Sequence, residues 1–231
     1  MDLPPGVREQ QLTDWLEYAS RSGDHLLGHG YQAAVYLYEG CDPPLVLKTC
    51  WGRGLARYLR RLMLVREWRA YQRLRGVSGI PHGYGMLNGE HLVLEYIRGV
   101  PFRQAEIDDR EHFLERLVAL VEQLHERGVA HCDLKKKENV MVLEDGKPCF
   151  LDLGAAICFK PGFAPLNHQL FRIGQILDRN ACLKLYCGKP LSRLSLAGFQ
   201  RTRIEKVTRW VRYRRAEFRR LVARRRERKD H

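Results

Sequence analysis

The stretch HCDLKKKENVMVLEDGKPCFLDLG, residues 131–154, decides the fold of this chain. Its first part places an acid, Asp133, a lysine, Lys135, and an amide, Asn139, within one short loop. A second acid, Asp152, closes an apolar run thirteen residues after Asn139 and is followed by glycine. A carboxylate and an amide oxygen at these positions can hold a divalent ion. A solvated surface turn has a similar composition. The residues upstream are therefore needed to distinguish a metal-binding site from a simple turn.

A glycine-containing segment, GHGYQAAV, lies between two predicted strands near the start of the chain. It places Gly28, Gly30, Ala33 and Val35 in the pattern G-x-G-x-x-A-x-V. Glycines let backbone amides approach phosphate oxygens without a side chain in the way. The third glycine of a dinucleotide motif is missing and the segment does not open a helix, which argues against a dinucleotide-binding fold.

Lys48 lies inside the apolar segment LVLKT, thirteen residues after Val35. A lysine within an apolar strand is costly unless it finds a partner. Glu67 follows nineteen residues later and is the only acid between Asp42 and Glu90. We expect an ion pair that orients the Lys48 ammonium toward phosphate; the alternative is an edge-strand lysine that points into water.

The order of these groups resembles the protein-kinase-like superfamily. The similar segments are LVLK (45–48) for V-A-I-K, HCD (131–133) for H-R-D, and DLG (152–154) for D-F-G. LHERGVAHCDL (124–134) also resembles the family's run into its catalytic loop, and LVLEYI (92–97) resembles its hinge. The resemblance covers about residues 26–160.

The resemblance implies an α+β, two-lobed protein-kinase-like fold in a single domain. The small β-rich N-lobe would span about residues 1–95, and the reduced helical C-lobe about residues 98–231. Its implied activity is ATP- and Mg²⁺-dependent transfer of phosphate to a hydroxyl acceptor.

The resemblance also implies a role for each matching residue. Lys48 would contact the nucleotide phosphates and Glu67 would position it. Asp133 would accept the hydroxyl proton and Lys135 would steady the transferred phosphoryl group, while Asn139 and Asp152 would hold magnesium. Leu94 would occupy the gatekeeper position of the adenine pocket. The other residues expected at the ATP site are Leu27, Gly28, Gly30, Ala33, Val35, and Glu95 and Ile97 through their backbone groups.

Three departures from the family pattern narrow the class. Asp133 and Asn139 are six residues apart instead of five, which places an extra residue among Lys135–Glu138. Cys132 replaces the arginine that would read an activation-loop phosphate. No A-P-E motif follows Asp152, and only 79 residues remain. In the short segment after Asp152, the chain resembles Rio-type kinases and the bacterial kinases of lipopolysaccharide core sugars.

Three functions therefore remain open. The first is a small atypical serine/threonine protein kinase. The second is a kinase for a sugar or a lipid-linked saccharide. The third is a nucleotide-binding pseudokinase that serves as a scaffold, against which the presence of Lys48, Glu67, Asp133, Asn139 and Asp152 argues.

Hydrophobic periodicity predicts the elements that would carry these residues. The apolar residues of 55–75 recur at a period near 3.6, which predicts a helix: Leu55, Leu59, Leu62, Val65, Trp68, Tyr71 and Leu74. Further helices are predicted over 8–20, over 109–127 and from 166 onward. The predicted strands lie on either side of the Gly40–Pro44 turn, over 91–97, and in a hairpin that turns at Asp145-Gly146.

Composition predicts a globular protein of the cytoplasm. The chain has 231 residues, of which 45% are hydrophobic. No apolar run is long enough for a transmembrane helix, and no secretory signal is visible at the N-terminus. The seven cysteines are scattered without metal-like spacing, so we expect reduced thiols.

The charge is unevenly distributed. Residues 201–231 contain fourteen Lys/Arg and four Asp/Glu, and residues 53–75 contain eight arginines and one acid, out of a net charge of +13. The tail is predicted to be a basic amphipathic helix, which either packs on the helical lobe or contacts an anionic membrane surface or a phosphorylated substrate. The membrane contact would place the protein at the inner face of the membrane. No RNA-binding signature argues for nucleic acid.

Overall fold

The computed structural model describes residues 1–29 and 33–187. All of them belong to the first of two compact units, Met1–Leu191, while the second unit is Ser192–His231. Gly30 and the basic tail 201–231 therefore lie outside the described residues. Within the described part, no helix combines the length and the apolar character that crossing a bilayer requires.

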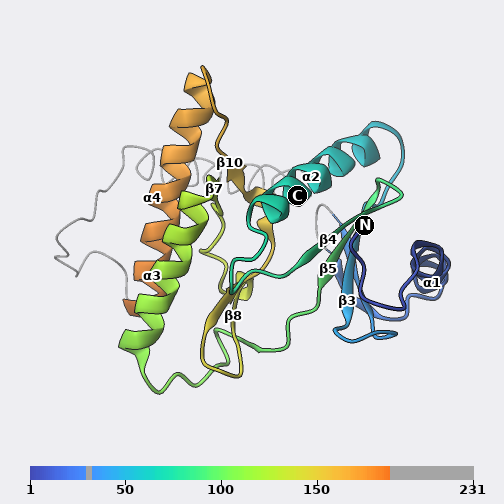
Figure 1. Ribbon diagram of the computed structural model, residues 1–231, viewed down its shortest axis with the longest axis horizontal. Helices are drawn as coiled ribbons and strands as arrows, with labels where there is room; N and C mark the ends of the chain where they lie inside the picture. Colours follow the sequence, from blue (N-terminus) through green and yellow to red (C-terminus); the bar gives the residue numbers. More distant parts are fainter. Residues whose placement is uncertain (30–32, 188–231) are drawn as a thin grey trace, which may run out of the picture. The chain divides into compact units, whose positions relative to one another are not determined.

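The first half of the described chain contains a five-stranded antiparallel sheet (Figure 1). Its strands run in the order β1-β2-β3-β5-β4. Their bounds are β1 Leu26–His29, β2 Ala34–Tyr38, β3 Leu45–Thr49, β4 Gly83–Leu87 and β5 His91–Glu95. β4 is not among the strands predicted from sequence, because two of its five residues are glycine and give no alternating pattern.

The two faces of the sheet have different partners. Successive side chains of a strand point to opposite faces. In β3, Leu45 and Leu47 join the core formed with α1 (Glu9–Ser22), whereas Val46 and Lys48 line a pocket on the other face. The β3 strand therefore carries Lys48 between Val35 of β2 and Leu92 of β5.

The helix α2 (Gly54–Arg73) confirms the predicted helix, but it does not bury all of the predicted stripe. Leu64 and Tyr71 are buried in the core, whereas Leu55, Leu59 and Leu62 are exposed. The periodicity of these residues thus predicted the helix and not the face that packs.

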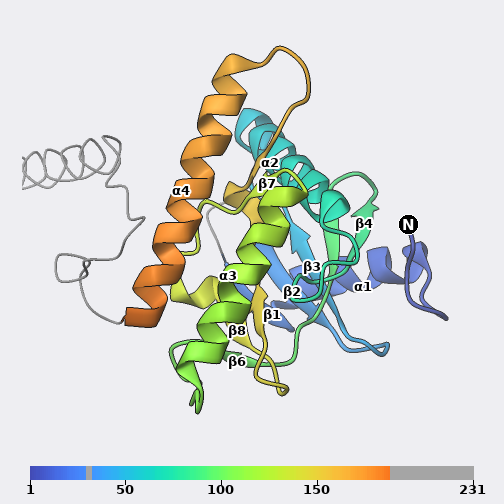
Figure 2. The same ribbon diagram turned by 60° about the vertical axis from the view of Figure 1, so that its left-hand side comes forward.

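Two long helices, α3 (Arg110–Glu126) and α4 (Pro165–Cys187), make up most of the second half. They lie side by side in both views of the ribbon (Figures 1 and 2). Short paired strands fill the space between these helices and the sheet: β6 Val100–Pro101, β7 Val129–Ala130, β8 Val140–Val142, β9 Pro148–Phe150 and β10 Ile157–Cys158. The β8–β9 pair is the predicted hairpin. The sheet-rich first part and helical second part confirm the α+β, kinase-like fold expected from the sequence.

Candidate nucleotide and phosphoryl-transfer site

Three charged side chains from distant parts of the sequence meet at one point. The Lys48 Nζ lies 2.6 Å from Glu67 Oε1 of α2 and 3.0 Å from Asp152 Oδ1. Glu67 is only 1% exposed, so its carboxylate has little contact with water. The ion pair expected between Lys48 and Glu67 is therefore present, and Asp152 completes a triad around one ammonium group.

The charges of this triad stabilise one another against the cost of burial. Burial alone disfavours the Lys48 ammonium, but the Glu67 and Asp152 carboxylates raise its pKa above the usual value. Burial also opposes ionisation of Asp152, yet the adjacent Lys48 holds the pKa of that carboxyl below its ordinary value. Asp152 is thus an anion at neutral pH, and Lys48 is a cation.

The catalytic loop is held by a buried carboxylate of α4. Asp178 accepts hydrogen bonds from the backbone N–H groups of His131 and Cys132, each at 2.7 Å. The ring Nε2 of His125 lies 3.1 Å from the same side chain. Cys132 adopts a left-handed backbone conformation, with φ of 68°, that non-glycine residues rarely take. The two backbone bonds to Asp178 hold the loop in this conformation.

His131 connects the catalytic loop to the strand that leads to Asp152. Its ring is fully buried, and Nε2 lies 3.0 Å from the carbonyl oxygen of Leu151. The Leu151 N–H in turn donates to the carbonyl oxygen of Asn139 at 2.8 Å. These contacts fix Asn139 and Asp152 relative to one another, although they are thirteen residues apart.

The lysine that contacts Asp133 is Lys136, the neighbour of Lys135, to which the sequence assigned the transferred phosphoryl group. Lys136 Nζ lies 2.6 Å from Asp133 Oδ2, and the hydrogen bond between them raises the pKa of Lys136 above its usual value. Both lysines are exposed, but Lys136 lines the pocket and Lys135 is not among the lining residues. Among the three consecutive lysines of this loop, Lys136 is thus the one that the folded chain places beside Asp133.

Asn139 and Asp152 offer the oxygen atoms that a magnesium ion prefers. The side-chain Nδ2 of Asn139 donates to the carbonyl oxygen of Asp133 at 3.2 Å, which leaves Oδ1 as its ligand atom. Both side chains line the same pocket. Two protein oxygens are enough for Mg²⁺, because this ion usually takes its remaining ligands from water and from substrate phosphates. The residues present therefore fit the metal.

A pocket of about 460 Å³ joins these groups to the inner face of the sheet. Its lining includes ten of the predicted site residues. Eight were predicted for the nucleotide, namely Leu27, Ala33, Val35, Lys48, Glu67, Leu94, Glu95 and Ile97, and two for the metal, Asn139 and Asp152. Gly28 lies in β1 but is not part of the lining, and Gly30 is outside the described residues. Asp133 is not a lining residue either, yet its partner Lys136 is.

The segment after β5 presents backbone groups to this pocket. The Tyr96 N–H donates to the carbonyl oxygen of Pro44, and the Glu95 N–H donates to that of His82. The N–H of Ile97 forms no hydrogen bond within residues 1–29 and 33–187. Ile97 therefore has a donor to offer to a flat heterocycle that enters between Leu27 and Leu94.

Two residues of the site were missed by sequence reasoning. Lys136 could not be chosen from three consecutive lysines, because only the path of the loop decides which one turns toward Asp133. Asp178 lies in a helix for which the sequence predicted a start near residue 166 but no buried residues. A lone acid beside the apolar residues Ala181 and Cys182 is the signal that could have marked it as buried.

Comparison with known proteins agrees with this geometry. The RIO domain family matches residues 52–162, which include Glu67, Asp133, Asn139 and Asp152. CBL-interacting protein kinase 25 of Oryza sativa subsp. japonica is 29% identical over 182 residues, which cover 72% of this chain and 32% of that protein. The chain thus spans about a third of the length of this curated relative.

The fold has a counterpart among solved structures. The crystal structure of the Rio2 kinase from Chaetomium thermophilum superimposes with a TM-score of 0.56 at 16% identity. The similar region covers 79% of this chain and 63% of that chain. The fold and site thus define a protein of the protein-kinase-like class. Within this class, the RIO domain match over residues 52–162 and the Rio2 kinase neighbour make the chain similar to atypical kinases of the Rio type.

Proposed function

We propose that the protein transfers the terminal phosphoryl group of ATP to the hydroxyl group of a serine or threonine in a protein substrate. The observation that carries this proposal is the joining of Lys48 to both Glu67 and Asp152 in a pocket that also contains Asn139 and Lys136. Similarity to a RIO domain and to a protein kinase supports a protein as the acceptor.

The phosphates of ATP would lie against the ammonium of Lys48, which Glu67 keeps in place. The adenine would enter the apolar part of the pocket, between residues of β1, β2 and β5. There it would accept a hydrogen bond from the N–H of Ile97 and donate one to the carbonyl oxygen of Glu95. A rigid site of this kind accelerates the reaction mainly by positioning and by neutralising charge.

The transfer itself would use the groups around Asp133. Asp133 accepts the proton of the acceptor hydroxyl as its oxygen attacks the γ-phosphorus, and the bond from that phosphorus to the ADP oxygen breaks. Lys136, beside Asp133, neutralises negative charge on the transferred group, the part that the sequence assigned to Lys135. Asn139 and Asp152 would hold magnesium, which would neutralise charge on the phosphates.

The proposal is tested by following labelled phosphate from γ-labelled ATP into candidate acceptors. We expect labelled phosphoserine or phosphothreonine in a protein acceptor with the natural chain, and none with Asp133→Asn. This substitution preserves the size of the side chain and removes its ability to take up the proton.

Two other results would overturn the proposal in distinguishable ways. Transfer of the label to a saccharide but to no protein would show that the acceptor class is wrong. Tight ATP binding without transfer to any acceptor or to water would show a nucleotide-binding scaffold instead of an enzyme.

A further inference from the structure

In the first half of α2, the arginines bond to other segments of the protein while the apolar residues are exposed to solvent without such partners, which is the reverse of the usual arrangement. Arg57 Nη2 lies 2.5 Å from Glu90 Oε2, and Arg61 Nε donates to the carbonyl oxygen of Gly89 at 2.8 Å. The guanidinium of Arg60 stacks 3.8 Å from the centroid of the Trp51 ring. These contacts tether the outer end of α2 to the turn between β4 and β5 and to the loop after β3.

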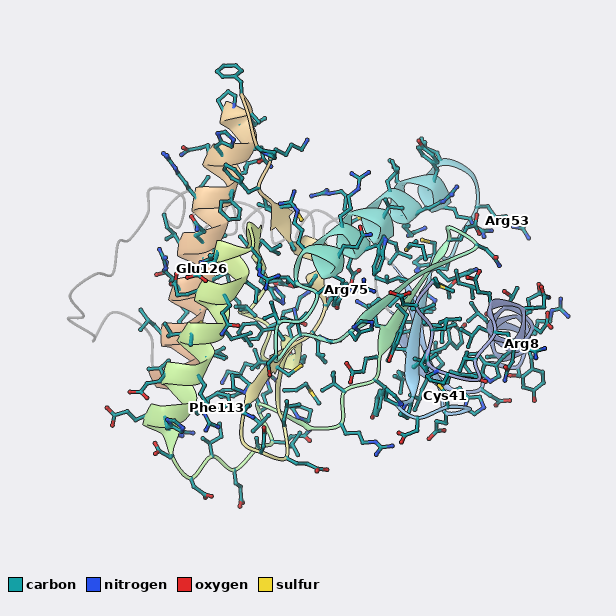
Figure 3. The ribbon with its side chains drawn as sticks, viewed as in Figure 1. Arg8, Cys41, Arg53, Arg75, Phe113 and Glu126 are labelled. Atoms are coloured by element: carbon teal, nitrogen blue, oxygen red, sulfur yellow. The ribbon has the colours of Figure 1, made fainter. Side chains whose placement is uncertain are left out.

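The opposite side of the same turns is apolar and faces outward. Leu55, Tyr58, Leu59 and Leu62 are 73%, 55%, 51% and 42% exposed, respectively. Their spacing of three, four and seven residues places them in one row along the helix, which we call the outer stripe. Figure 3 labels Arg53 at the outer end of α2 and Arg75 just beyond its inner end, so the outer stripe lies on the half of the helix near Arg53.

An outer stripe of this kind indicates a binding surface. A surface helix normally turns its apolar residues toward the core and its charged residues toward water. Single exposed leucines are common, but a contiguous apolar row rimmed by charges marks a place where a partner binds. Anchors at this spacing are those that a helix presents to another helix.

Two arginines extend the outer stripe along the helix. Arg66 and Arg69 follow Leu62 by four and seven residues, so they continue the same row. Both are exposed, and neither forms an ion pair or a hydrogen bond with another described residue. The surface is therefore apolar at one end and cationic at the other, along a single line.

This arrangement distinguishes between possible partners. The arginines on the opposite face of the same turns, Arg57 and Arg61, are bonded to Glu90 and to the Gly89 carbonyl oxygen. The cations Arg66 and Arg69 instead lie beyond the apolar residues along the helix axis, whereas a helix in a membrane surface carries its cations on the face opposite its apolar residues. The chain's own tail, residues 201–231, is strongly basic, and so is α2 of a second copy. Both would bring like charges to Arg66 and Arg69.

We propose that the outer stripe, together with Arg66 and Arg69, binds an acidic amphipathic helix of another protein. The partner helix would pack leucine-like side chains against Leu55, Leu59 and Leu62. One turn further along, its carboxylates would pair with Arg66 and Arg69. The complementary charges would fix the direction in which the partner lies along α2.

The test measures the binding of short, fluorescent synthetic helices to the full chain by anisotropy, without nucleotide. The probe peptides carry a row of leucines followed, one turn away, by two glutamates, in both orders along the helix. We expect one order to bind and the other to bind more weakly. Replacing Leu59 and Leu62 with glutamine should weaken binding about tenfold or more, since truncating anchor residues has effects of this size.

A matched control comes from α4, where Leu166 and Leu170 are also exposed. The substitutions Leu166→Gln and Leu170→Gln should leave the affinity of the peptide unchanged. Arg66→Glu with Arg69→Glu should abolish binding of the glutamate peptide and create binding of a lysine version. All of these positions are on the surface, and circular dichroism of each variant establishes that it is folded.

Three results would overturn the proposal. The first is no binding of either peptide order. The second is binding that Leu59→Gln and Leu62→Gln do not weaken. The third is binding, through the same residues, to vesicles of phosphatidylcholine and phosphatidylserine in place of the peptide, which would make the surface a membrane contact. None of these readouts requires catalysis, so the result is independent of the proposed function.

Discussion

Lys135 and Lys136 are adjacent in the sequence but have different surroundings. Only Lys136 contacts Asp133, at 2.6 Å, and only Lys136 lines the pocket. We expect Lys136→Ala to lower kcat about a hundredfold, which is the usual cost of removing one group that stabilises transition-state charge. Steady-state assays of ATP turnover measure the effect.

The neighbouring lysine supplies the control for this prediction. Lys135→Ala removes the same side chain from a position that does not line the pocket, and it should leave kcat close to its natural value. Equal losses in both variants, or a larger loss for Lys135→Ala, would show that the geometry of the loop does not select Lys136.

The ionisation of Asp152 predicts a specific dependence of stability on pH. Because Lys48 lowers the pKa of Asp152 in the folded protein, ionisation of this group favours the folded state above its unfolded pKa of about 3.9. This contribution is lost as the pH falls through the folded pKa. The difference in unfolding free energy between the natural chain and Asp152→Asn should therefore be constant above about pH 5. Below that pH, the natural chain should lose stability relative to Asp152→Asn.

Urea unfolding of both proteins across this range measures that difference. Glu67 is present in both chains, but Asp152 raises the pKa of its carboxyl group, so the comparison also includes the change in the titration of Glu67. A difference that is independent of pH, or one that grows in favour of the natural chain at low pH, would contradict the assigned pairing.

At the scale of elements, α4 determines the shape of the catalytic loop although it contributes no residue to the pocket lining. Asp178 of this helix accepts two backbone hydrogen bonds from the loop and is 1% exposed. Its replacement by alanine would leave two buried N–H groups and His125 without a partner. We expect Asp178→Ala to lower the free energy of unfolding by about 3–5 kcal/mol.

Denaturant unfolding tests this prediction, with Glu126→Ala as the matched control. Glu126 is an exposed acid at the end of α3, labelled in Figure 3, and its removal should change stability by less than about 0.5 kcal/mol. A loss for Asp178→Ala as small as that of the control would mean that the loop holds its conformation without α4.

The position of α2 is likewise fixed by bonds to distant elements. At its inner end, Arg73 Nη1 donates to the carbonyl oxygens of Gly128 at 3.2 Å and Phe159 at 2.7 Å. Its outer end is held by Arg57 and Arg61. Because both ends are tethered, Glu67 in between remains against Lys48, while the outer stripe is left free for a partner.

At the scale of the whole molecule, the pocket is lined both by residues of the five-stranded sheet and by residues from the second half of the described chain, which contains the catalytic loop. A nucleotide bound there would contact both and stabilise the folded state by mass action, by about 2.7 kcal/mol at one hundred times its Kd. We expect the Tm to rise by several degrees with ATP and Mg²⁺, and by less when EDTA removes the metal.

The metal-dependent part of this rise identifies the magnesium ligands. It should disappear in Asp152→Asn, which lacks the carboxylate, while a smaller rise with ATP alone remains. Differential scanning fluorimetry with each combination of ATP, Mg²⁺ and EDTA provides the measurement. An equal rise in Tm with and without EDTA in the natural chain would contradict a metal held by Asn139 and Asp152.

The sequence by itself predicted much of the fold and of the site. Helical periodicity predicted α1, α2 and α3 to within a few residues, and the family resemblance carried by Lys48, Glu67, Asp133, Asn139 and Asp152 implied the kinase-like fold. These features are accessible because periodicity and motif spacing can be read along the chain without knowing its contacts. The tail 201–231 lies outside the described residues, so its packing or membrane contact stays a prediction.

Tertiary structure alone decided which side of each element faces a partner. The periodic leucines of α2 predicted a helix, but only the packing of the folded chain determines that Leu64 is buried and Leu55 is exposed. The path of a loop with one additional residue determined that Lys136 meets Asp133. The burial of Asp178 depends on a loop 46 residues away in sequence, at Cys132. Such outcomes depend on contacts between distant segments, which no local pattern encodes.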